Sequence, residues 1–305
     1  MVRMAAGEKV KEAPGPKLDA TEVDKGLWKV KVPHGKGFLK IGSEKKHGDA
    51  NSLFLEINNS RKFEVGNDCD TCYFWFKCVS EPRLAANKKI VNLPKTISLP
   101  RPLDANMVQE LSPMLEIMEK GEYYLYNTTV RLGGPYKADD EASYFYNSEF
   151  LEIWDIEDPA EEGLLSDWEH YEGSKPRLFR GEALMEKQFD FIVPLVPRRQ
   201  LKEEYIKLYQ QMIQSGDRPR ILVLGMLQRP IPESVLRGEA KALHSFFAGF
   251  VLDGHHKLAA YRRADVAAPL LVVLSQKASK YVLIKKEEGT NPRQKMEERL
   301  ASLAG

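Results

Sequence analysis

The sequence is poor in cysteine, has almost no net charge and contains no long apolar run. It has three cysteines among 305 residues. A small, odd number of cysteines argues against a disulfide framework and is typical of a reducing compartment, so a cytoplasmic location is expected. Lysines and arginines number 45, against 44 aspartates and glutamates. This balance excludes a bulk positive field that would steer the whole chain to nucleic acid.

Apolar runs are too short for a membrane helix, which needs roughly 18 or more apolar residues in sequence. The longest apolar stretch, Ala267 to Leu274, is interrupted by Pro269. The first residues carry charges and prolines but lack the apolar core of a secretory signal. We therefore expect no membrane association, and residues 1–20 are predicted to be a disordered leader.

The chain is too long for one minimal domain, and two domains are the natural expectation. Alternating apolar and polar residues predict strands over 28–32, 38–41 and 53–57, and aromatic and β-branched residues predict further strands over 123–132 and 143–154. Between them, the spacing predicts a helix over 104–120, which Pro113 kinks or splits and Gly121 ends. Residues 21–180 are therefore predicted to form a β-rich α+β domain, with a boundary near Gly181.

Beyond that boundary the pattern changes to alternating strands and helices. Strands are predicted over 189–196, 221–224, 250–252 and 270–274, and helices over 201–215, 258–263 and part of 286–304. An insertion, 225–249, separates two of these strands. It carries Glu233, which could serve as the catalytic acid. The alternative is that the insertion is a solvated helix that covers the edge of the sheet. Residues 181–305 are thus predicted to be a mixed α/β domain, which makes the whole chain α+β.

One turn in this region has the chemistry of an anion site. The segment Asp253-Gly254-His255-His256-Lys257 follows an apolar strand and leads into a helix. Glycine lets the backbone approach a ligand closely, and the start of a helix presents unpaired N–H groups and a positive dipole end. Such an end binds phosphate, and imidazole and ammonium groups add donors. The alternative is that the two histidines only cap the helix and satisfy the turn.

The segment FVLDGHHKLAAYRRADVAAPLLVVL, 250–274, resembles the signature of the ParB-like nuclease/sulfiredoxin superfamily, and LKEEYIKLYQQMIQSGDRPRILVL, 201–224, resembles the helix and strand before it. The resemblance spans about 189–275 and implies a loop that binds nucleotide phosphates. The superfamily's partition proteins use CTP, its sulfiredoxins ATP and its free-serine kinases ADP or ATP. The two histidines are most similar to those of the free-serine kinase branch.

The sequence departs from the superfamily pattern in three ways, and each makes one of the known activities less expected. The kinase branch carries an acid just after a proline, whereas Pro197 is followed here by two arginines. The sulfiredoxin cysteine is missing from the loop, which excludes that reaction. Only about 30 residues follow the motif, too few for the DNA-binding modules of partition proteins. Sequence-specific DNA binding is therefore not expected.

The function predicted from the loop is binding of a nucleotide, namely ATP, ADP or CTP, or of another phosphorylated small molecule, together with Mg²⁺. The predicted binding residues are Gly254, His255, His256 and Lys257. Asp253, His255 and Glu233 are the candidate catalytic residues for phosphoryl transfer or nucleotide hydrolysis. Two alternatives stay open: a non-enzymatic regulatory module that binds a protein partner, and a ParB-like nuclease.

Three cysteines form a second candidate site. Cys69, Cys72 and Cys78 have the C-x-x-C spacing of a zinc knuckle plus one further thiolate, and His47 is the candidate fourth ligand of a structural Zn²⁺. An iron–sulfur site is a competing interpretation. The third is that the cysteines are buried thiols in an aromatic-rich strand.

Overall fold

The computed structural model of this chain combines helices with a larger amount of β-sheet, which agrees with the α+β class at that level. The residues that it describes are 18–45, 51–67, 74–78, 95–132, 177–180, 185–196, 200–229, 237–238, 242–283 and 291–304. Within these ranges, no helix combines the length and the apolar character needed to cross a bilayer.

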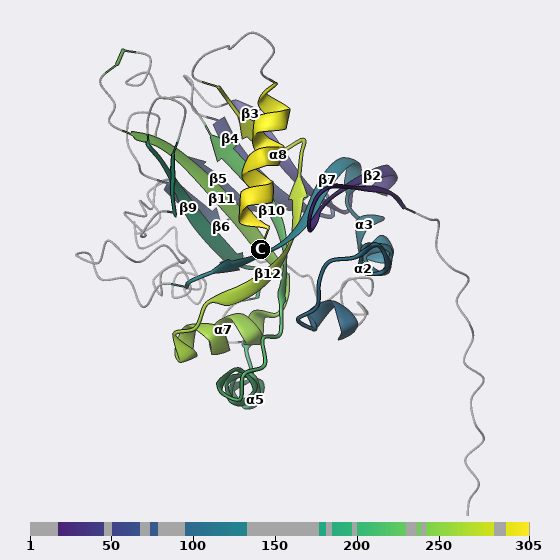
Figure 1. Cartoon of the computed structure of the whole chain (residues 1–305), viewed down its shortest axis with the longest axis vertical. Helices are drawn as coiled ribbons and strands as arrows, with labels where there is room; N and C mark the ends of the chain where they lie inside the picture. Colours follow the sequence, from purple (N-terminus) through teal and green to yellow (C-terminus); the bar gives the residue numbers. More distant parts are fainter. Residues whose placement is uncertain are drawn as a thin grey trace, which may run out of the picture.

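The larger sheet runs in the order β1-β2-β7-β12-β10-β11-β9-β8, and β13 pairs with β10 (Figure 1). These strands are β1 (Asp19–Asp24), β2 (Leu27–Lys36), β7 (Glu119–Val130), β8 (Arg177–Arg180), β9 (Met185–Pro194), β10 (Ile221–Arg229), β11 (Ala242–Asp253), β12 (Ala268–Ser275) and β13 (Lys280–Tyr281). The sheet is mixed, because β10 pairs antiparallel with β11 and parallel with β12. Its central strands β10 and β12 are apolar along most of their length, as buried strands are, and end in polar residues.

A second, antiparallel sheet has the order β3-β4-β5-β6. Its strands are β3 (Leu39–Lys45), β4 (Asn51–Ile57), β5 (Ser60–Asn67) and β6 (Phe74–Cys78). The two sheets share one hydrophobic core, in which the Phe63 ring of β5 lies 6.1 Å from the Phe250 ring of β11. In Figure 1 this sheet lies behind the larger one.

The helices lie around the larger sheet. They are η2 (Lys95–Ser98), α2 (Ala105–Glu110), α3 (Ser112–Leu115), α5 (Glu203–Gln214), α7 (His255–Ala264) and α8 (Pro292–Leu303). Helices α5 and α7 pack together at one end of the sheet, and α8 crosses the face opposite the second sheet (Figure 1). The strand and helix predictions over 28–32, 38–41, 53–57 and 201–215 are confirmed as β2, β3, β4 and α5.

Two predictions of local structure are wrong. The helix predicted over 104–120 starts as predicted at the Asp104 cap and is divided next to Pro113, but it ends at Leu115, and residues from Glu119 belong to β7, so Gly121 lies inside a strand. Hydrogen bonds of β7 to β2 and β12 outweigh the helical spacing that the sequence shows there. The insertion predicted from Gly225 is also too long, because β10 continues to Arg229 and β11 begins at Ala242. These two strands pair with each other along their length.

The boundary predicted near Gly181 does not coincide with a break in the sheet. Strand β7 precedes that point and β12 follows it, yet the two pair antiparallel from Tyr123 with Ser275 to Val130 with Ala268. Two domains joined near Gly181 stay a prediction, and any such division crosses one continuous sheet.

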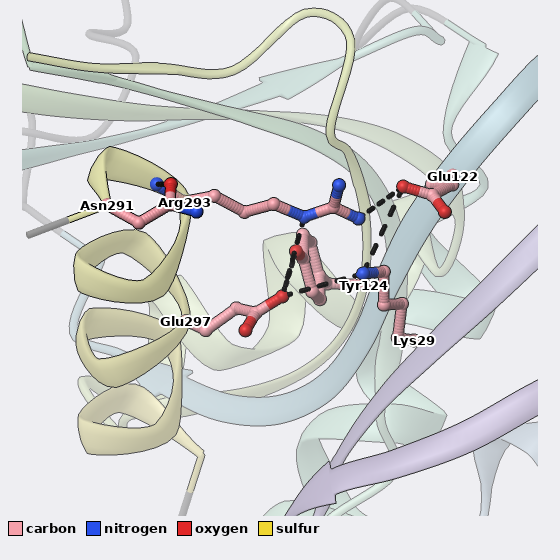
Figure 2. Close-up of polar contacts among 6 residues, drawn as sticks. All are labelled: Lys29, Glu122, Tyr124, Asn291, Arg293 and Glu297. Carbon is pink, nitrogen blue, oxygen red and sulfur yellow. Dashed lines mark hydrogen bonds and ion pairs between the residues drawn. The ribbon is translucent and has the colours of Figure 1, made fainter. Parts of the chain in front are cut away.

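Helix α8 is fixed to the sheet by a polar cluster near its first turn (Figure 2). Asn291 caps the helix by accepting the Arg293 N–H at 2.9 Å, and Arg293 reaches Glu122 of β7. The Tyr124 hydroxyl donates to Glu297 at 2.5 Å, and Lys29 lies 3.7 Å from the same carboxylate. The charges balance, so this cluster fastens the helix and leaves no surplus charge for a ligand.

Farther along α8, a buried ionic network links the helix to three strands. Glu186 of β9 is 1% exposed and accepts from Arg229 at 2.9 Å, Arg299 at 2.8 Å and Ser245 at 2.7 Å. Arg229 also stacks on the Tyr281 ring, 4.6 Å from its centroid. The two buried guanidinium groups thus share one buried carboxylate.

We expect Glu186→Ala to destabilise the fold strongly, because it leaves Arg229 and Arg299 buried without their counter-charge. The expected loss in the free energy of unfolding is about 3–5 kcal/mol, measured by urea denaturation. Glu203→Ala is the matched control, since its ion pair with Arg263 is exposed and removing it costs about 1 kcal/mol or less. Equal losses in the two variants would contradict the conclusion that Glu186 is the buried counter-charge of these arginines.

Candidate functional site

The turn between β11 and α7 has the conformation that its glycine predicts. Strand β11 ends at Asp253 and α7 begins at His255. Gly254 between them has φ 103°, in the left-handed region, and a Cβ there would meet Ile221 Cα at 3.3 Å. An L-residue at this position would therefore be strained both by its backbone and by its contact.

The first turn of α7 has no side-chain cap. Gly254 is the N-cap residue, and no side chain of the described structure accepts from the first N–H groups of the helix. The helix has ten residues, enough for the dipole of its aligned peptide groups to favour negative charge at this end. The backbone N–H groups of the turn are therefore a potential anion site.

The two histidines hold this turn against the segment that leads into α5. His255 Nε2 accepts the N–H of Leu195 at 3.0 Å, and His256 Nε2 accepts the N–H of Lys202 at 3.0 Å. The His256 ring also meets the Tyr205 ring edge-on, with centroids 5.4 Å apart. Nε2 of each imidazole is an acceptor here, and the His255 ring also donates to the Val251 backbone, whereas the sequence assigned both side chains as donors to phosphate.

Both histidines are neutral at neutral pH. Burial lowers the pKa of His255 to about 4, outweighing the opposing effect of Asp253. Burial also lowers the pKa of the less buried His256. As a general base, His255 would first have to release the Leu195 N–H from Nε2.

Lys257 is a buried cation whose donors are all used inside the protein. It is 4% exposed, and its ammonium donates to Ser98 Oγ at 2.7 Å, Asp253 Oδ2 at 2.9 Å and the Arg220 carbonyl at 3.0 Å. An ammonium has three N–H donors. Lys257 therefore has no free hydrogen bond for a ligand, and Asp253 balances its charge.

Asp253 is the one carboxylate of the loop itself. Its side chain is 49% exposed although one oxygen accepts from Lys257. Its charge also contributes, after burial, to the raised pKa of Tyr209 on α5. A half-exposed carboxylate beside an uncapped helix start is a suitable oxygen ligand for Mg²⁺.

Sequence reasoning missed Arg220, whose carbonyl accepts a hydrogen bond from Lys257 of the turn. It is 3% exposed and donates to Asn127 Oδ1 at 2.9 Å and to the carbonyls of Arg101 at 2.9 Å and Ile97 at 3.0 Å. Burial lowers its pKa to about 10. An arginine ahead of an apolar strand gives no local signal of this role, because its partners come from distant segments.

The remaining predicted site residues are not brought to the turn by the described structure. Glu233, His47, Cys69 and Cys72 lie outside the described residues, and Cys78 is described only as backbone at the end of β6. Among the residues with described side chains, no group of three or more histidine, cysteine, aspartate or glutamate residues has metal-site geometry. The zinc site stays a prediction.

Comparisons with known proteins add no relative: no protein-family model, curated protein or solved structure matches the chain. The chemistry of the turn is therefore argued from its own geometry.

We expect the free energy of unfolding to decrease as the pH is lowered, partly because of His255. Its pKa is about 4 in the fold against an ordinary value of 6.5, so the unfolded chain binds the proton more tightly. The stabilising contribution is complete above pH 6.5 and is lost as the pH falls toward 4. Between pH 7 and 5 the loss should be about 2 kcal/mol, measured by urea denaturation.

His255→Gln keeps a hydrogen-bond acceptor but cannot titrate, so its stability should depend less on pH over this interval. His34→Gln, which changes an exposed histidine of β2, should keep the wild-type dependence. A wild-type slope in His255→Gln would show that this imidazole is not the buried neutral group described here.

Proposed function

We propose that this chain binds a nucleotide (ATP, ADP or CTP) or another phosphorylated small molecule at the N-terminus of α7. The observation that carries the proposal is the uncapped first turn that follows the left-handed Gly254. Its N–H groups provide main-chain donors for phosphate oxygens. The ammonium of Lys257 is paired with Asp253, so the positive end of the helix supplies the charge that favours an anion here.

The side chains of the loop then have roles different from those predicted. His255 and His256 position the turn by anchoring it to Leu195 and Lys202, and the backbone supplies the phosphate donors. Asp253 is placed to hold a Mg²⁺ that bridges phosphate oxygens. For phosphoryl transfer or hydrolysis, the Asp253 carboxylate is the candidate general base, because the Nε2 lone pair of His255 is occupied.

We also propose that residues 181–305 have the ParB/sulfiredoxin-like arrangement, in a cytoplasmic protein. The element order β9, α5, β10, β11, α7, β12 supports this proposal. So does the position of the candidate loop, which connects β11 to α7. Strands β9 and β11 run parallel, as do β10 and β12. In this chain β12 additionally pairs with β7 from the preceding part of the chain.

Thermal shift with ATP, ADP, CTP and GTP, each with and without Mg²⁺, tests the proposal. A ligand at about 100 times its dissociation constant should stabilise the fold by about 2.7 kcal/mol. His256→Glu places a carboxylate at the first turn, where it competes for the N–H groups and repels phosphate. We expect at least about tenfold weaker binding in this variant.

His256→Gln is the matched control, because it keeps an acceptor for the Lys202 N–H without adding charge. It should bind nucleotide nearly as the wild type does. If His256→Glu and His256→Gln bind equally well, the ligand does not lie over this helix end, and if no nucleotide shifts the melting temperature, the proposed function is wrong.

The role of Asp253 has its own test. Asp253→Asn should remove the Mg²⁺-dependent part of the nucleotide shift, since an amide is a weaker ligand than a carboxylate for this ion. Without Mg²⁺ the variant should bind at least as tightly as the wild type, because a negative charge beside the phosphates is gone. Unchanged Mg²⁺ dependence would place the metal elsewhere.

A further inference from the structure

The second sheet ends in a strand whose outer edge is largely open. Strand β3 pairs with β4 along one side, from Leu39 with Ile57 to Lys45 with Asn51. On its other side, the described structure has a single bridge, between Leu39 and Met118. An edge of this kind presents main-chain donors and acceptors to whatever lies beside it.

The direction of these groups follows from Leu39. Its N–H donates to the Ile117 carbonyl at 3.0 Å, away from β4. Along an antiparallel strand, successive residues direct their N–H and C=O groups to opposite sides. Ile41 and Ser43 therefore point the same way as Leu39, and no described residue pairs with their main-chain groups.

A cavity of about 570 Å³ adjoins this edge. Residues 40–43 of the edge strand β3 line it, together with Leu53, Phe54 and Glu56 of the neighbouring strand β4. The rest of the lining comes from the larger sheet and the turn after β12, namely Glu119 of β7, Gln228 of β10 and residues 277–280. The volume lies within the usual range of binding cavities, roughly 300–1,000 Å³.

The charges around the cavity favour a negative occupant. Lys40 pairs with Glu56 at 2.6 Å, and Lys277 pairs with Glu119 at 2.5 Å. Lys280 is exposed on β13, and no described carboxylate pairs with it. The lining thus carries three ammonium groups against two carboxylates, one net positive charge.

We propose that the edge of β3 binds an extended peptide segment of a partner protein that carries acidic side chains. The segment would hydrogen-bond to Ile41 and Ser43 as an added strand of the second sheet. Its carboxylates would meet Lys280 and the neighbouring lysines. A second copy of this chain fits less well, because pairing two β3 edges would bring their lysine-rich walls together.

Fluorescence anisotropy with the full chain and a labelled, end-capped peptide of alternating valine and glutamate tests the proposal. Ser43→Pro removes the outward N–H of Ser43 but no bond to β4, a position at which an edge strand tolerates proline. We expect about tenfold or weaker binding in this variant, since a main-chain hydrogen bond is lost and the ring intrudes. Ser43→Ala, which keeps the N–H, should bind as the wild type does.

Two further probes do not depend on how Ser43→Pro folds. A peptide methylated on alternate backbone nitrogens should bind at least about tenfold more weakly than its parent, because it cannot form the ladder. Lys280→Glu should weaken the valine–glutamate peptide and improve binding of a valine–lysine peptide.

Several outcomes would overturn the proposal. One is equal binding of the parent and methylated peptides to the wild-type chain. Another is a peptide displaced fully by inorganic phosphate, which would make the cavity a small-anion site. A third is self-association of the wild type that Ser43→Pro abolishes, without peptide binding. Nucleotide binding at α7 is a separate measurement, so either proposal can fail alone.

Discussion

A charged side chain that leaves water has to meet an opposite charge or a full set of hydrogen bonds, and this constraint determines how distant parts of the chain join. Glu186 fixes α8 and β10 to β9 by pairing with both Arg229 and Arg299. Lys257 joins the start of α7 to Ser98 and to the Arg220 carbonyl. Each contact links residues far apart in sequence, so the sheet, its covering helix and the loop are fixed together.

The same constraint changes the chemistry of the loop after β11. Its imidazole and ammonium groups have the composition of a phosphate site, yet the fold uses them to anchor the turn. Within the described part of the chain, no side chain caps the backbone N–H groups of the first helical turn. The proposed phosphate recognition is therefore a property of the main chain, which Gly254 makes accessible and the side chains hold in position.

The edge of β3 offers main-chain groups in another geometry. The start of α7 directs several N–H groups toward one region, which suits a compact anion. The edge of β3 alternates donors and acceptors along a line, which suits an extended peptide. In both places the side chains add charge around a recognition surface formed by the backbone, so the two proposals require different ligands.

Sequence alone determined the features that depend on neighbouring residues. The glycine turn at Gly254, the amphipathic helix α5 and the alternating strands β2 to β4 follow from local spacing and turn chemistry. Tertiary structure decided what depends on distant partners. Strand β7 replaced a predicted helix because β2 and β12 supply its hydrogen bonds, and His255 became an acceptor because the Leu195 N–H lies beside it. A local pattern specifies how a segment can bend and which face is apolar, but it does not specify which polar group a buried side chain will meet.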